Sequence, residues 1–159
     1  MAKQNILITG ISGQDGIFLA NRILSEDSDK YNIYGISRQN PSVTINKIKS
    51  LGPFDKNLKI INNDLTDPSK VLNLIRDINP SKVFNLSGPS SVYDSIKNAS
   101  YFETTINKIF DNITNACIQL KVFPAFFQAC SSEMFSNKNS MPLNELSIFD
   151  PRTPYAKGK

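Results

Sequence analysis

Residues 6–16 read Ile6-Leu7-Ile8-Thr9-Gly10-Ile11-Ser12-Gly13-Gln14-Asp15-Gly16. The apolar run Ile6–Ile8 has the length of a buried β-strand, and the residues from Gly16 to Leu24 follow with helical periodicity. A second apolar stretch, Tyr31–Ile36, is predicted to be another strand. These three segments form one βαβ unit, so the glycine-rich turn lies between the end of a strand and the start of a helix.

The rest of the chain repeats the alternation of strand and helix. Strands are predicted at Leu58–Ile61, Lys82–Leu86 and Ala125–Ala129, and helices at Pro68–Asp77 and Ser100–Leu120. Asp67 is expected to cap the helix that starts at Pro68, and Pro80 ends it. Because parallel neighbours need crossover connections, the pattern predicts an α/β fold: a Rossmann-like parallel sheet with helices on both faces.

The segment Gln39–Asn57 has weak periodicity and contains two prolines. We predict a loop there, with one helical turn around Ile45–Leu51. The length of 159 residues predicts one domain, residues 1–159.

Composition excludes several classes of function. The net charge of +4 is spread along the chain and never forms a basic run, so no nucleic-acid partner is expected. Two distant cysteines, Cys117 and Cys130, and the absence of histidine exclude a disulfide framework, a zinc site and histidine-dependent triads. The N-terminus shows neither a signal peptide nor a lipidation motif, so we expect a cytoplasmic protein without a membrane partner.

The three glycines have the spacing G-x-x-G-x-x-G, one residue wider than the dinucleotide fingerprint. Gly10 permits a tight turn, Gly13 lets backbone N–H groups approach a pyrophosphate, and Gly16 allows close packing of helix on strand. The positive end of the following helix points at the phosphates. The alternative is a plain turn; the strand before it and the helix after it favour dinucleotide binding.

Arg38 follows the second strand, where NAD-binding folds place an acidic residue that holds the ribose. A guanidinium there binds a 2′-phosphate with a bidentate, charge-assisted fork, which favours NADP over NAD. The alternative is a solvated surface arginine. Asp64, after the third strand, is placed to accept a hydrogen bond from an adenine amino group.

Two clusters near the C-terminus carry reactive side chains. Tyr155 and Lys159 are four residues apart and share a helix face, so the ammonium stabilises the tyrosinate and makes Tyr155 a candidate general base. Ser131, Ser132 and Glu133 follow the strand at 125–129, at the edge where open α/β sheets bind ligands. Helix capping is the alternative role for the two serines.

With these residues assembled, the chain resembles the extended short-chain dehydrogenase/reductases and, within them, the GDP-mannose 4,6-dehydratase family. The resemblance runs along nearly the whole chain. It is most specific in residues 8–16, in residues 128–135, and in Asn144-Glu145 with Pro151–Tyr155.

The resemblance implies a dehydratase that acts on GDP-mannose with NADP. Tyr155, helped by Lys159, would remove the proton of the C4 hydroxyl, and Ser131 would hydrogen-bond the C4 oxygen. Glu133 would take the C5 proton and assist the loss of the C6 hydroxyl as water, with hydride passing from C4 to the coenzyme and back to C6. Implied coenzyme contacts are Gly10, Ser12, Gly13, Gln14, Asp15, Gly16, Arg38, Asp64, Leu65, Leu86, Ser87, Ser90, Tyr155 and Lys159.

The chain departs from the family pattern in sequence and in length. Pro89 and Ser91 replace glutamine and histidine, Gln39 replaces a second arginine, and Gly158 stands where alanine is usual. The family's chains continue for about as long again with a substrate domain, so we expect this polypeptide to be an N-terminal part with an incomplete sheet, inactive alone and oligomeric at full length. Two other functions stay open: a nucleotide-sugar epimerase or reductase, and a non-catalytic NADP-binding module.

Overall fold

The computed structural model describes residues 2–50, 57–135 and 142–159. The chain divides into two compact units, one made of Met1–Ser87 and Ile109–Gln128 and the other of Gly88–Lys108 and Ala129–Lys159.

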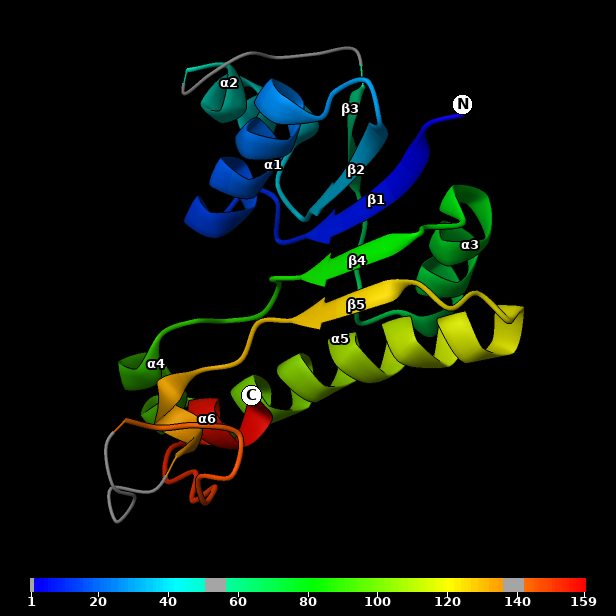
Figure 1. Cartoon of the computed structure of the whole chain (residues 1–159). Coiled ribbons are helices and arrows are strands. Elements are labelled where there is room, and N and C mark those ends of the chain that lie inside the picture. The colour runs from blue at the N-terminus through cyan, green and yellow to red at the C-terminus, as the bar shows by residue number, and fades with distance from the viewer. Residues whose placement is uncertain (1, 51–56, 136–141) are drawn as a thin grey trace. The chain divides into compact units, whose positions relative to one another are not determined.

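The first unit is built on a parallel sheet of five strands (Figure 1). The strands are β1 (Gln4–Thr9), β2 (Tyr31–Ser37), β3 (Leu58–Asn62), β4 (Lys82–Asn85) and β5 (Ala125–Gln128). Their order is β3-β2-β1-β4-β5, and every neighbouring pair is parallel. The predicted Rossmann-like sheet is therefore confirmed. The order reverses between β1 and β4, and in open α/β sheets ligands bind outside the carboxyl ends of the strands at such a point.

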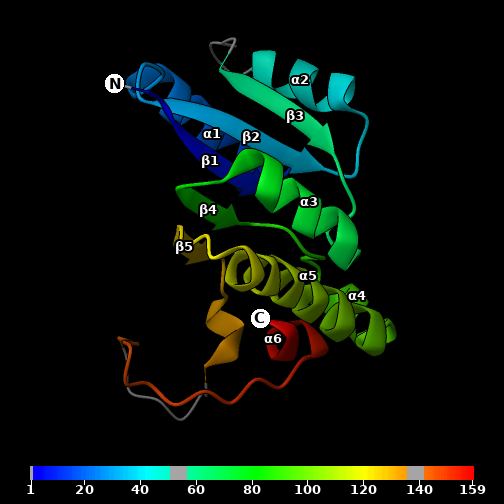
Figure 2. The same cartoon turned by 90° about the vertical axis from the view of Figure 1, so that its right-hand side faces the viewer.

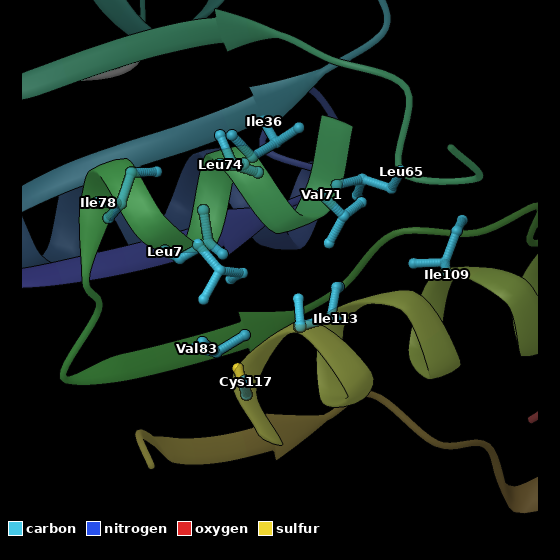
Figure 3. Packing of buried hydrophobic residues seen from close by; sticks show 12 residues of the cluster. Leu7, Ile36, Leu65, Val71, Leu74, Ile78, Val83, Ile109, Ile113 and Cys117 are labelled. Atoms are coloured by element: carbon cyan, nitrogen blue, oxygen red, sulfur yellow. The ribbon is translucent and has the colours of Figure 1, made fainter. Parts of the chain in front are cut away.

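Helices cover both faces of this sheet (Figure 2). One face carries α1 (Gln14–Glu26) and α2 (Pro41–Lys49); the other carries α3 (Pro68–Ile78) and the second half of α5 (Ala99–Leu120). Because side chains alternate along a strand, Ile6 and Ile8 pack under α1 while Leu7 packs under α3. Figure 3 shows Leu7 and Val83 of the sheet against side chains of α3 and α5. Two fully buried apolar layers thus hold the strand ends in place.

Residues 41–49 form α2, so the loop prediction is wrong for residues 41–44, whereas the helical turn expected around Ile45–Leu51 coincides with this helix as far as Lys49. Pro41 occupies the first turn, where its missing N–H costs nothing, and the Asn40 side chain accepts a hydrogen bond from Ser42 N at 2.9 Å. Thr44 and Ile48, one turn apart, are the buried residues of this helix. The prolines and the weak periodicity had indicated a loop where this helix begins. Residues 51–56 of the predicted loop lie outside the described residues.

The second unit contains α4 (Val92–Lys97), the first half of α5, the 3-10 helix η1 (Ser132–Met134) and α6 (Pro154–Gly158). α6 packs against α4 and against η1. Asp150 N donates to Met134 O at 2.9 Å, and the rings of Phe135 and Phe149 lie 5.1 Å apart, so the segment before α6 is fastened to η1. Helix α4 was not predicted from the sequence.

Neither a membrane-spanning helix nor a metal-binding cluster of side chains is present among the described residues. No helix among them is both long and apolar enough to cross a membrane. No group of three or more histidine, cysteine, aspartate or glutamate side chains in the described part of the chain lies close enough to hold a metal ion.

The cap at the start of α3 was predicted correctly. The Asp67 carboxylate accepts hydrogen bonds from Ser69 N at 3.0 Å and Lys70 N at 3.2 Å. Asp67→Ala is therefore expected to lower the free energy of unfolding by about 1 kcal/mol in urea denaturation. Asp77→Ala, in the exposed last turn of the same helix, is the control and should stay within about 0.5 kcal/mol of the unmodified chain. Equal losses in both variants would contradict the capping role.

Candidate functional site

The glycine turn after β1 is packed so closely that two of its glycines admit no side chain. Gly10 has a φ of 68°, and a Cβ on it would lie 2.8 Å from Leu86 O. A Cβ on Gly16 would lie 2.6 Å from Gly10 O and 2.7 Å from Ile11 Cα. Because these neighbours are backbone atoms, they cannot turn aside. Gly10 therefore lets the turn rest against the segment after β4, and Gly16 lets α1 start directly on the turn.

The N-terminus of α1 differs from those of α2, α3, α4 and α6. Gly13 is its N-cap residue, is exposed, and supplies no side-chain hydrogen bond. Side chains do cap α2, α3, α4 and α6, through Asn40, Asp67, Ser91 and Thr153. The first turn of α1, with the exposed Gln14 and Asp15, thus keeps its positive end without a side-chain acceptor, which is the arrangement that receives an external anion.

The predicted adenosine-phosphate contacts gather at the carboxyl ends of β1, β2 and β3. The nearly buried Ser37 hydroxyl donates to Ser12 Oγ at 3.1 Å and accepts from Gln39 N at 3.0 Å. The Arg38 side chain is exposed next to Ser37, and its backbone oxygen accepts from Asn62 Nδ2 at 3.1 Å. The exposed guanidinium therefore lies at the carboxyl end of β2, and β2 itself contains no acidic residue.

Asp64 lies in a turn of its own. Its carboxylate accepts from Thr66 N at 3.0 Å and from Thr66 Oγ1 at 2.8 Å. These two hydrogen bonds lower the pKa of Asp64, and the charges of Lys70 and Arg38 lower it further. The carboxylate is thus kept ionised and able to accept further hydrogen bonds. Its neighbour Leu65 is buried, and Leu65 O accepts from Asn112 Nδ2 at 2.9 Å.

The segment after β4 is held by residues to which sequence reasoning gave no role. Leu86 N and Ser87 N both donate to Thr9 Oγ1, at 3.1 and 3.2 Å, and Ser87 Oγ donates to Asn85 Oδ1 at 2.9 Å. Thr9 and Asn85 are both nearly fully buried. The available signal was a polar residue directly after an apolar run, Thr9 after Ile6–Ile8 and Asn85 after Val83 and Phe84, since buried strand ends rarely carry unpartnered polar groups.

The second unit holds the predicted catalytic residues. Tyr155 begins a helical turn in which Lys159 N donates to Tyr155 O at 3.2 Å, so the predicted shared face is confirmed. Lys159 Nζ lies 5.9 Å from the centre of the Tyr155 ring and donates to Ala129 O at 2.8 Å. Burial lowers the pKa of Lys159, and the charge of Cys130 acts in the opposite direction.

The serines and the glutamate after β5 lie beside that helix. Ser131 is the N-cap residue of η1, where its Oγ accepts from Glu133 N at 3.2 Å, so the capping role that we considered for it is present. Ser132, Glu133 and Ser90 are exposed. Because α6 packs against η1 and Lys159 is tied to Ala129, this unit brings the predicted catalytic residues into one neighbourhood.

Two departures from the family pattern have local explanations. A Cβ on Gly158 would lie 3.0 Å from Ile106 Cδ1 and 3.4 Å from Glu103 Cα, so α6 packs on α5 more closely than an alanine would comfortably allow. Ser91 caps α4 by accepting from Asp94 N at 3.1 Å. Pro89 and Gln39 have no comparable explanation in the structure.

Comparison with solved structures shows the fold. The UDP-Glc/GlcNAc 4-epimerase of Campylobacter jejuni superposes with a TM-score of 0.84 at 19% identity, covering 98% of this chain and 46% of that one. The UDP-glucose 4-epimerase of Bifidobacterium longum superposes with a TM-score of 0.83 at 15% identity and the same two coverages.

Comparison of sequences identifies closer relatives. The chain is 31% identical to the GDP-mannose 4,6 dehydratase of Cricetulus griseus over 96% of its own length and 42% of that protein. It is 31% identical to the GDP-mannose 4,6-dehydratase of Vibrio cholerae over 100% of its own length and 43% of that protein. The chain thus spans less than half the length of these relatives. The family model of GDP-mannose 4,6 dehydratase matches residues 7–159, and the chain belongs to this family.

Proposed function

We propose that this chain binds NADP through the turn from Gly10 to Gly16 and supplies the proton-transfer residues of a GDP-mannose 4,6-dehydratase. The observation that carries the proposal is the start of α1, where a close-packed glycine turn leads into a helix without a side-chain cap. A diphosphate is the anion that such a turn accommodates in folds of this kind.

The residues at the strand ends fit the coenzyme. Gly13 and the first turn of α1 would hold the diphosphate, Ser12 and Arg38 the 2′-phosphate, and Asp64 with Leu65 the adenine. The segment from Leu86 to Ser90 would lie along the ribose. When bound, the coenzyme supplies a hydride acceptor and donor. Structural neighbours include an enzyme of Bordetella bronchiseptica solved in complex with NAD+, with a TM-score of 0.77 to this chain.

NADP is favoured over NAD by charge. The residues that end β2 and follow it, Ser37 to Asn40, include no carboxylate that would repel a 2′-phosphate. The exposed guanidinium of Arg38 is free to meet a phosphate in a bidentate geometry, which a lysine does not reproduce. The Ser12 hydroxyl accepts from Ser37 and keeps its own proton for a further acceptor.

The proton steps fall to the second unit. Tyr155 would take the proton of the sugar C4 hydroxyl, with the Lys159 side chain one helical turn away. The Ser131 hydroxyl, fixed by its cap to η1, would hydrogen-bond the C4 oxygen. The exposed Glu133 carboxylate would remove the proton at C5 and then protonate the departing C6 hydroxyl.

Glu133 separates this reaction from its alternatives. Loss of water across C5 and C6 requires a base for the C5 proton, whereas epimerisation at C4 or simple hydride transfer does not. The family of the chain and a carboxylate at this position together favour the dehydratase over an epimerase, a reductase or a non-catalytic module.

The coenzyme proposal is tested by titrating the unmodified chain and Arg38→Ala with NADP+ and NAD+ in calorimetry and thermal-shift measurements. NADP+ should bind the unmodified chain more tightly than NAD+. Arg38→Ala should weaken NADP+ binding by about tenfold to a hundredfold, the equivalent of one or two charge-assisted hydrogen bonds, and leave NAD+ binding unchanged. The matched control is Arg76→Ala, which removes an exposed arginine of α3 that bonds Asn73. Equal affinities for the two coenzymes, or equal losses in the two variants, would argue against the assignment.

The role of Glu133 is tested in GDP-mannose dehydration by a protein that contains these residues. Glu133→Gln keeps the size of the side chain and removes its basicity, so the rate should fall by about 10²- to 10⁴-fold. Glu26→Gln, an exposed glutamate at the end of α1, serves as control and should leave the rate unchanged. Dehydration at the ordinary rate in Glu133→Gln would exclude this residue as the base.

The lysine next to Tyr155 gives a pH-dependent signal. Because burial lowers its pKa, Lys159 should titrate below the ordinary lysine value of 10.5 in an NMR titration of the lysine side chains. The unfolded chain holds this proton more tightly than the folded chain, so the group's contribution to stability should increase as the pH rises from the folded pKa toward 10.5. Lys159→Met identifies the resonance by its loss. A midpoint at or above 10.5 would contradict the burial of this amine.

A further inference from the structure

A buried hydrogen-bond network joins the carboxyl ends of β1, β4 and β5. Asn85 Oδ1 accepts from Thr9 Oγ1 at 2.6 Å and from Ser87 Oγ at 2.9 Å, and Asn85 Nδ2 donates to Gln128 Oε1 at 2.7 Å. The exposed fractions of Thr9 and Asn85 are 0% and 1%. One amide therefore bridges three strand ends: its bond to Thr9 is buried and difficult to replace, and its bonds to Ser87 and Gln128 are partly buried.

Thr9 continues the pairing of β1 and β4 beyond the last residue of the ladder. The register of the two strands ends at the pair Thr9 and Asn85. Leu86 N and Ser87 N then donate to the Thr9 hydroxyl at 3.1 and 3.2 Å. A hydroxyl has one donor and two acceptor positions, so this one is fully used: it accepts two backbone N–H groups and donates to Asn85.

The network fixes the distance between two loops. Gly10 follows Thr9 directly, and the space where its Cβ would stand is filled by Leu86 O and Ser87 Cα. The same two residues are also held by hydrogen bonds: Leu86 and Ser87 by Thr9, and Ser87 by Asn85 as well. A shift of either loop would therefore break a buried hydrogen bond or press backbone atoms together, so the glycine turn and the segment after β4 keep one separation.

We propose that Asn85 and Thr9 are positioning residues of the coenzyme site: they set the glycine turn and the segment Leu86–Ser87 at the spacing that NADP requires, before the coenzyme binds. The inference rests on the proposed function, because both loops are assigned to the coenzyme there. Neither residue contacts the coenzyme in this account; each acts through the loop that it holds.

Position 85 requires a side chain that both accepts and donates hydrogen bonds, as the amide of Asn85 does. Aspartate at position 85 would have no N–H for Gln128 Oε1 and would bury a negative charge, and an apolar residue would leave Thr9, Ser87 and Gln128 without this partner. Thr9→Ser would keep the hydroxyl and remove the methyl group, whereas Thr9→Val would keep the shape of the side chain and remove the hydroxyl. The two Thr9 substitutions therefore separate the hydrogen bonds from the packing.

Asn5, at the amino end of β1, provides a matched control for Thr9 and Asn85. Asn5 Nδ2 donates to Ile78 O at 2.6 Å, and Asn5 Oδ1 accepts from Asn32 Nδ2 at 3.2 Å. Asn5→Ala thus removes an asparagine that also bridges separate elements, but at the amino end of β1. It should lower stability without changing the separation of the two loops.

The test measures NADP+ affinity by calorimetry and melting temperature for the unmodified chain, Asn85→Ala, Thr9→Val, Thr9→Ser and Asn5→Ala, at a temperature where each is folded. Asn85→Ala and Thr9→Val should raise the Kd for NADP+ by about tenfold or more, and Thr9→Ser and Asn5→Ala should stay within about twofold, whatever their melting temperatures. If Asn85→Ala does not fold, the Thr9 pair decides.

Each other outcome has a definite meaning. An unchanged Kd in Asn85→Ala, or equal losses in Thr9→Val and Thr9→Ser, would overturn the positioning role and leave the proposed function standing. Failure of the unmodified chain to bind NADP+ would overturn the proposed function and this inference with it. Hydrogen exchange provides a check without substitutions: the amides of Leu86 and Ser87 should be protected in the coenzyme-free chain, and exchange at the rate of unprotected amides would contradict preorganisation.

Discussion

The close backbone contact between Gly10 and Leu86 is the constraint on which the candidate coenzyme site depends. It requires a residue without Cβ at a positive φ, and it places the turn after β1 directly against the segment after β4. A second contact of the same kind, between Gly16 and the backbone of Gly10 and Ile11, fixes where α1 begins. The helix start that faces the predicted diphosphate is therefore set by glycine packing, and no side chain of the chain itself occupies its cap position.

The buried polar side chains of the first unit's strands lie at the carboxyl ends of those strands. The strand interiors carry apolar residues on both faces, and two layers of helices cover them. Thr9, Ser37 and Asn85 are the buried polar residues at strand ends, and each has hydrogen-bond partners in neighbouring loops. The apolar layers fix the positions of the strand ends, and the polar residues at those ends hold the loops by hydrogen bonds. The same strands therefore support both the fold and the candidate site.

Much of this architecture could be predicted from periodicity. The strands, the long helices and the glycine turn followed from apolar runs of two lengths and from one motif, because these signals are local. Only the second half of the helix Pro41–Lys49 was expected, because Pro41 indicated a loop, although proline at the first helical position favours a helix. The six-residue helix α4 is too short to show a period. Gly158 and the Thr9–Asn85 pair depend on contacts with residues far away in the sequence, which no local pattern reveals.

The central claim, that the start of α1 receives the diphosphate of NADP, is tested most directly by following backbone amide resonances of the chain during a titration with NADP+. The account predicts that the largest shifts fall on Gly13, Gln14, Asp15 and Gly16, because their N–H groups would lie closest to the phosphates. Saturable shifts confined to other parts of the chain, with these four amides unmoved, would contradict it.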